Sequence, residues 1–128
     1  MLMAVYFRDD EVLFARALQS IFESHLLPSQ VVLVVDGPIS KELKDVIDLY
    51  DSLECLEVVY LEKNVGLAAA LNHGLAYAKF EVVFRADSDD YNYPDRFEKQ
   101  LKHLESGPFD LIGCAVREVD RSMTPIAV

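Results

Sequence analysis

Apolar runs and amphipathic stretches alternate along the chain. Mostly apolar runs predict strands at residues 2–6, 31–35, 56–61 and 81–86, and the unbroken run at residues 31–35 predicts a strand covered on both faces. Apolar residues at helical spacing predict helices at residues 11–24, 41–53, 67–79 and 94–105. Asp10 and Ser40 are the expected N-caps of the first two helices, and Pro94 is expected in the first turn of the last. A final apolar run, residues 109–119, predicts a fifth strand.

This alternation with short connections defines the fold class. Right-handed crossovers between successive strands give a mostly parallel sheet with helices on both faces. We therefore predict a doubly wound α/β fold, formed by a single domain over residues 1–128. After Val119 the pattern weakens: residues 120–122 are typical of a hairpin turn whose second strand would occupy residues 125–128. We expect this domain to be truncated at its C-terminal end.

Composition narrows the classes of ligand. The chain has 128 residues, 52% of them hydrophobic, and a net charge of -10, so the charge belongs to a folded body. Such a domain is repelled by nucleic acid and by anionic lipid, whereas a small ligand carried with a divalent cation fits. Cys55 and Cys114 have no metal-like spacing, which favours two buried free thiols in a reducing compartment. No run is long enough to span a membrane, and we expect a cytoplasmic protein.

Polar side chains follow the predicted strands. They are Tyr6, Asp36, Asn64, Asp87, Ser88, Asp89 and Asp90. Ligands bind outside the carboxyl ends of the strands in an open parallel sheet, so these side chains should share one edge. Clustered carboxylates repel one another unless a cation arrives, and hard oxygen donors without nearby His or Cys favour magnesium or manganese. The alternatives are a solvated acidic turn at residues 87–90, a turn-forming Asp36, and a core position for Tyr6.

Longer motifs resemble a known family. The segments VVLVVDGP and NVGLAAALNHGLAYAKFEVVFRADSDDYNYPDRFEKQL closely resemble family 2 glycosyltransferases, particularly bacterial enzymes of exopolysaccharide, lipopolysaccharide or capsule synthesis. The resemblance covers nearly the whole chain. It implies a GT-A fold and inverting transfer of a sugar from a nucleoside-diphosphate sugar to a saccharide or a lipid-linked saccharide. UDP-sugars are the first choice of donor, and GDP-mannose is the second.

The resemblance also implies roles for single residues. Tyr6 would lie against the nucleotide base and Asp36 would hydrogen-bond it, while Asp87 would contact the ribose or diphosphate. Asp89 would bind Mn²⁺ or Mg²⁺ directly. The two asparagines at motif positions, Asn64 and Asn72, would line or buttress the donor site.

Two positions of this chain depart from the family pattern, and the chain has no counterpart of the family's general base. Phe7 stands where Asn is common and Leu71 where many members have Arg, so the donor contacts should differ in detail. No residue matches the family's acidic general base, so we expect no catalytic residue in this chain and place the base beyond Val128. Any membrane attachment would likewise depend on parts of a parent protein that lie outside this sequence.

Two other functions remain as alternatives. A phosphorylation-switched receiver domain has a similar length and an acidic pair, here Asp9 and Asp10, after its first strand. It requires an Asp after the third strand, where this chain has Asn64, and a Lys after the fifth. A non-catalytic nucleotide-binding α/β module would bind a nucleotide with metal but would transfer nothing.

Overall fold

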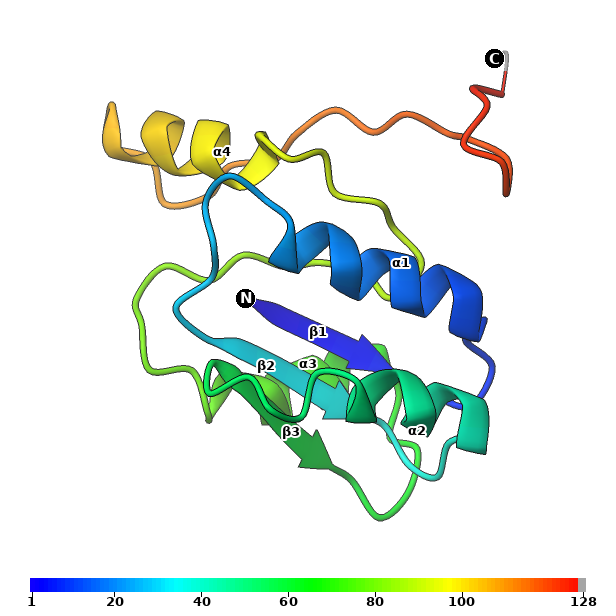
Figure 1. Cartoon of the computed structure of the whole chain (residues 1–128). Coiled ribbons are helices and arrows are strands. Elements are labelled where there is room, and N and C mark those ends of the chain that lie inside the picture. Colours follow the sequence, from blue (N-terminus) through cyan, green and yellow to red (C-terminus); the bar gives the residue numbers. More distant parts are fainter. Residues whose placement is uncertain (127–128) are drawn as a thin grey trace. The chain divides into compact units, whose positions relative to one another are not determined.

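A three-stranded parallel sheet forms the centre of the first part of the chain. The computed structural model describes residues 1–126, which fall into two compact units that divide after Phe97. In the first unit, β1 (Leu2–Val5), β2 (Val31–Val35) and β3 (Leu56–Tyr60) lie in the order β1-β2-β3 (Figure 1). The predicted parallel α/β sheet is confirmed, and β2 occupies the predicted residues.

The fourth predicted strand is reduced to a single bridge. Leu2 donates its N–H to the carbonyl of Phe84 at 2.8 Å and accepts from the N–H of Ala86 at 3.1 Å. Because β2 occupies the other edge of β1, the segment at Arg85 lies beside β1 and away from β2. Its carboxyl end therefore reaches the same edge of the sheet as the ends of β1 and β2.

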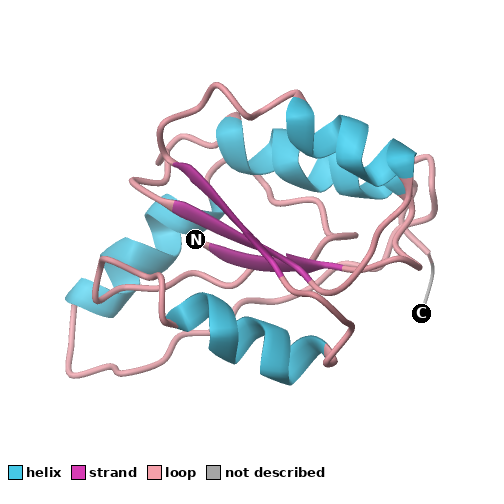
Figure 2. Cartoon of the chain, turned by 90° about the horizontal axis from the view of Figure 1, so that it is seen from below, coloured by secondary structure: helices cyan, strands magenta, loops and turns pink. Residues whose placement is uncertain are grey.

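Helices cover both faces of this sheet, as predicted (Figure 2). Alternate side chains of β1 and β2 point to opposite faces, so that Met3 and Leu33 pack with α1 (Glu11–Phe22) and α2 (Lys41–Asp48). Leu2 and Val34 pack on the other face, with α3 (Leu67–Leu75). A methyl group added at Gly74 would lie 2.6 Å from both of those side chains, so the glycine permits close packing of α3 on the sheet.

Both predicted helix caps are present. The Asp10 carboxylate accepts from the N–H groups of Val12 and Leu13 at 3.0 and 3.1 Å, and the Ser40 hydroxyl accepts from Leu43 N at 3.2 Å. These bonds satisfy amide groups that the first turn of a helix leaves without partners. The helix starts were therefore fixed by local sequence.

The chain from Pro94 onward departs from the prediction. Helix α4 (Arg96–Glu105) begins two residues after Pro94, which lies in a turn before the helix. The predicted fifth strand at residues 109–119 is absent from the described part of the chain, apart from one antiparallel bridge between Val119 and Pro125. An apolar run forms a strand only where a neighbour accepts its backbone hydrogen bonds, and here Leu111 is 89% exposed. The predicted hairpin is limited to that bridge, and residues 127–128 of its second strand lie outside the described residues.

Two further expectations concern cysteines and membranes. Both cysteines are free, as predicted, but Cys55 is only half-buried and Cys114 is exposed, so the prediction of two buried thiols is wrong. Cys114 lies in the run that does not become a strand, which explains its exposure. No helix among residues 1–126 has the length and apolar character needed to cross a bilayer.

Candidate donor-binding site

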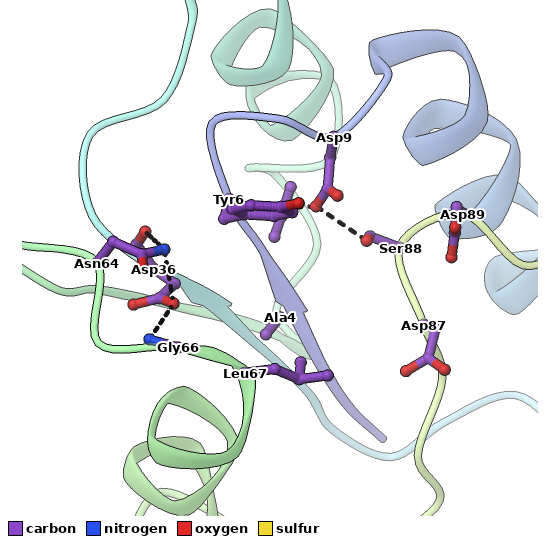
Figure 3. Close-up of a pocket in the computed structure, with 11 residues that line it drawn as sticks. Ala4, Tyr6, Asp9, Asp36, Asn64, Gly66, Leu67, Asp87, Ser88 and Asp89 are labelled. Carbon is purple, nitrogen blue, oxygen red and sulfur yellow. Dashed lines mark hydrogen bonds between the residues drawn. The ribbon is translucent and has the colours of Figure 1, made fainter.

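A pocket of about 400 Å³ lies at the carboxyl edge of the sheet (Figure 3). It is lined by Ala4, Val5, Tyr6, Asp9, Asp36, Asn64, Gly66, Leu67, Asp87, Ser88 and Asp89. The shared edge predicted from the order of strands and helices is therefore present. Tyr6 is 37% exposed, which contradicts the alternative that it is a core residue.

Asp36 braces one wall of this pocket. The residue is 3% exposed. Its carboxylate accepts from Val65 N at 2.7 Å, from Gly66 N at 3.0 Å and from the side-chain amide of Asn64 at 3.0 Å. The Asn64 amide also donates to the carbonyl of Asp36 at 3.2 Å. The end of β2 is thus tied to the loop between β3 and α3, so Asp36 and Asn64 hold each other as well as line the pocket.

A glycine lets these two loops approach closely. Gly37 has φ +85°, which L side chains rarely adopt, and a Cβ there would lie 2.5 Å from Asn64 N. Any larger residue at this position would push the β3–α3 loop away from the Asp36 carboxylate. The brace therefore depends on the glycine that follows the aspartate.

Asp87 is held on the opposite wall by an arginine. The Nε and Nη2 atoms of Arg85 both donate to Oδ1 of Asp87, at 3.1 and 2.8 Å. Among the described residues, Oδ2 of Asp87 has no hydrogen-bond donor. The arginine thus orients the carboxylate and leaves one of its two oxygens without a donor in the described part of the chain.

Asp9 is a pocket residue that the sequence indicated only as part of the acidic pair of the receiver-domain alternative, not as part of a donor site. Its Oδ2 accepts from Tyr6 N at 3.0 Å and from the hydroxyl of Ser88 at 2.9 Å. Burial, and to a smaller degree the charge of Asp89, raise the pKa of Asp9, while the two hydrogen bonds oppose that rise. The partner Ser88 is 79 positions away, so no local pattern could have indicated this contact.

The remaining acidic residues differ in their placement. Asp89 lines the pocket and is exposed. Asp90 lies outside the lining, and burial followed by the charges of Asp89 and Asp87 raises its pKa. Asn72, which was expected at the donor site, is exposed on α3 and is also absent from the lining.

A buried network supports the acidic loop from behind. The N–H and the side-chain amide of Asn92 both donate to the Ser20 hydroxyl of α1, each at 3.0 Å. Arg96 donates to the Asn92 side-chain oxygen and to the carbonyl of Arg85, the latter at 2.9 Å. These contacts show a structural role for Arg96 and hold both ends of the loop from residue 85 to residue 92.

The carboxylate oxygens of the pocket suit a divalent cation only together with an anionic ligand. Within residues 1–126 no three His, Cys, Asp or Glu side chains gather as a metal site. Magnesium-like ions typically take one or two carboxylates and complete their shell with phosphate oxygens and water. The open oxygens of Asp87 and Asp89 fit that requirement, whereas they could not hold such an ion alone.

Known proteins with related sequences include bacterial glycosyltransferases. The chain is 38% identical over 120 residues to a UDP-Gal:alpha-D-GlcNAc-diphosphoundecaprenol beta-1,3-galactosyltransferase of Escherichia coli, covering 93% of this chain and 44% of that protein. It is 42% identical to the amylovoran biosynthesis glycosyltransferase AmsE of Erwinia amylovora, covering 93% of this chain and 45% of the relative. The chain therefore spans about half the length of these relatives.

Solved structures share the fold at lower identity. A mannosyltransferase of Pyrobaculum calidifontis, in complex with GDP-Man and Mn²⁺, aligns with a TM-score of 0.69 at 23% identity, over 84% of this chain and 32% of that one. S. aureus TarS in complex with UDP-GlcNAc aligns with a TM-score of 0.68 at 24% identity, over 81% of this chain and 30% of that one. Residues 2–127 match the sequence family described as Glycosyl transferase family 2. The chain belongs to this family.

Proposed function

We propose that the pocket is the nucleotide-sugar site of a glycosyltransferase that builds a bacterial polysaccharide. The observation that carries the proposal is the pocket itself: an exposed tyrosine and two carboxylates with unbonded oxygens face one cavity at the carboxyl edge of the sheet. In this arrangement Tyr6 stacks on the base, Asp87 contacts the ribose or diphosphate, and Asp89 holds a divalent cation. Asn64 shapes the opposite wall of the pocket, together with Asp36.

The cation, Mn²⁺ or Mg²⁺, would neutralise charge on the diphosphate as it leaves the sugar. The residues of this chain bind and orient the donor so that the leaving group lies beside Asp87 and Asp89. Deprotonation of the acceptor hydroxyl, and inversion at the anomeric carbon, are assigned to a general base outside these 128 residues. The acceptor is a saccharide or a lipid-linked saccharide, supported by the diphosphoundecaprenol named for one relative.

The role of Asp36 follows from its contacts. Three donors already bind its carboxylate and the residue is 3% exposed, so little of the carboxylate is accessible to a base. We therefore propose that Asp36 serves the base indirectly, by fixing the loop of Asn64 and Gly66 along the pocket wall. Asn72 is proposed to support the site from α3, without contact with the donor.

Calorimetry tests the proposal. We expect UDP or GDP to bind the chain more tightly with Mn²⁺ than without it, and Mn²⁺ alone to bind weakly, because the carboxylates need the diphosphate to complete the metal's shell. UDP-galactose, UDP-GlcNAc and GDP-mannose would then identify the sugar. Nucleotide affinity that is independent of Mn²⁺ would contradict the metal site, and no affinity at all would contradict the donor site.

A transfer assay separates an enzyme half from a binding module. The isolated chain should bind the donor and transfer little or no sugar, because a positioned general base alone contributes about 10² to 10⁴ in rate. A longer protein, of the length of these relatives, should restore transfer. Equal turnover by both would place the base within this chain, and no turnover by either would favour a non-catalytic nucleotide-binding module.

A further inference from the structure

Two loops that are distant in sequence meet at Asp9. One oxygen of its carboxylate, Oδ2, accepts from Tyr6 N at 3.0 Å and from the Ser88 hydroxyl at 2.9 Å. Tyr6 belongs to the loop after β1, and Ser88 lies between Asp87 and Asp89 (Figure 3). The contact therefore connects the proposed base-binding end of the pocket to its proposed metal-binding end.

The segment from Asp87 to Asp89 is fixed by side-chain bonds at its first two residues. Arg85 holds Asp87 from one side, and Asp9 holds Ser88 from the other. The carboxylate of Asp89 accepts no hydrogen bond from the described residues, so its position depends on the backbone on either side of it. On one side the Asp90 N–H donates to the carbonyl of Asp87 at 3.4 Å, and on the other the Ser88 hydroxyl is the nearest side-chain contact from which Asp89 can be positioned.

The charge of the acceptor strengthens this connection. A hydrogen bond to an ionised carboxylate is roughly twice as strong as one between neutral groups. Asp9 is half-buried, which limits competition from water for the same oxygen. The cost is a like charge near Asp89, which a bound cation would offset.

We propose that Asp9 is a positioning residue that acts through Ser88 and sets the place of Asp89 relative to Tyr6. This inference rests on the proposed donor site. Asp9 does not touch the donor in this arrangement. It aligns the two ends of the pocket so that a base on Tyr6 and a diphosphate beside Asp89 are bound at once.

Substitution of the serine tests the connection most directly. Ser88→Ala removes the hydroxyl alone, and Ser88→Thr restores it. We expect Ser88→Ala to reduce the Mn²⁺-dependent gain in UDP or GDP affinity about tenfold, because groups that orient metal ligands typically contribute about 10- to 100-fold to metal affinity. Affinity without Mn²⁺ should stay within about twofold, and Ser88→Thr should recover most of the loss.

A double-substitution cycle identifies Asp9 as the partner. Asp9→Ala, which removes the acceptor, should cause at least the Ser88→Ala loss, and the double variant should be no worse than Asp9→Ala alone, since both substitutions remove the bond between these two side chains. Ser40→Ala is the matched control: it removes one hydroxyl hydrogen bond, to Leu43 N, from a residue outside the pocket lining. It should lower the melting temperature and leave Mn²⁺-dependent affinity unchanged.

Hydrogen exchange on the ligand-free chain gives a readout that does not depend on donor binding. Ser88→Ala should speed amide exchange at residues 87–90 without affecting α2. Unchanged exchange, or additive losses in the cycle, would overturn the proposed role of Asp9. Wild-type protein that lacks any Mn²⁺-dependent nucleotide binding would instead overturn the proposed function, and with it the purpose assigned to this contact.

Discussion

The two walls of the pocket carry carboxylates in opposite states. On one wall the buried carboxylate of Asp36 accepts three hydrogen bonds from the loop after β3. On the other, Asp89 is exposed and accepts none from the described residues, while Asp87 uses one oxygen for Arg85. In the sequence the two walls look the same, because each has an aspartate directly after an apolar segment of the sheet.

The difference in hydrogen bonding between the two walls indicates that one stabilises the fold and the other is suited to bind a ligand. A buried carboxylate that accepts three hydrogen bonds is already stabilised by its donors, and it has little left to gain from a ligand. A carboxylate with free oxygens among like charges gains most when a cation arrives. We therefore expect substitutions on the Asp36 wall to affect mainly stability, and those on the Asp89 wall to affect mainly binding.

Asp36→Ala should have the largest effect. It leaves two backbone N–H groups without their acceptor and removes one of the two hydrogen bonds of the Asn64 amide, so we expect the free energy of unfolding to fall by about 3 kcal/mol. Urea denaturation measures this change. Asp45→Ala, which removes an exposed ion pair with Lys41 on α2, is the control and should change stability by less than about 1 kcal/mol. Similar small losses for both variants would contradict the brace.

Asp89→Ala should show the reverse profile. We expect the Mn²⁺-dependent gain in nucleotide affinity to fall about tenfold or more, which corresponds to about 1.4 kcal/mol, because the proposed metal ligand is removed. The unfolding free energy should stay within about 0.5 kcal/mol, since the residue is exposed. Titration calorimetry with Asp110→Ala, another exposed aspartate, provides the control. Metal dependence that survives in the Asp89 variant would move the ligand to another residue.

Arg85→Gln should have an intermediate effect. Without its arginine, Asp87 loses orientation, and we expect nucleotide affinity to fall about threefold, or about 0.7 kcal/mol. Lys79→Gln breaks a comparable exposed ion pair, with Glu57, and should leave affinity unchanged. A gain in affinity in the Arg85 variant would show that the arginine competes with the ligand for Asp87.

Asp90→Asn should have the smallest effect, and it should depend on pH. Burial and the charges of Asp89 and Asp87 raise the pKa of Asp90 above its ordinary value of 3.8, so the folded state binds the proton more tightly than the unfolded state. Its contribution to stability therefore decreases as pH rises through that window. At pH 7 the variant should be more stable by up to about 0.5 kcal/mol, and the gain should vanish below about pH 4. Thermal melts at the two pH values decide this, and a gain that persists in acid would contradict the assigned cause.

Local signals explain which parts of the fold were predictable. The valine run gave β2 to the residue, and Asp10 and Ser40 gave the helix starts, because burial periodicity and capping act within a few residues. The apolar run at residues 109–119 did not form the predicted strand, because a strand also needs a neighbouring strand to accept its backbone hydrogen bonds. Nothing in the run itself indicates such a neighbour.

The site likewise has residues whose placement could be predicted and contacts that could not. The order of strands and helices predicted that Tyr6, Asp36 and Asp87 would share an edge, and they do. The contacts of Asp9 with Ser88 and of Ser20 with Asn92 span 79 and 72 positions and follow no period. The burial of Asp36 was equally hidden, since an aspartate before Gly37 is typical of an exposed turn.

The close approach at Gly37 has a consequence for sequence variation in the family. A side chain there would meet the backbone at Asn64, so the glycine, the aspartate before it and the asparagine opposite should change together or not at all. Relatives that replace the glycine should also lack the matching asparagine and reroute the loop before their third helix. In such proteins this wall would have a different outline, and donor preference could diverge there while the acidic segment stays the same.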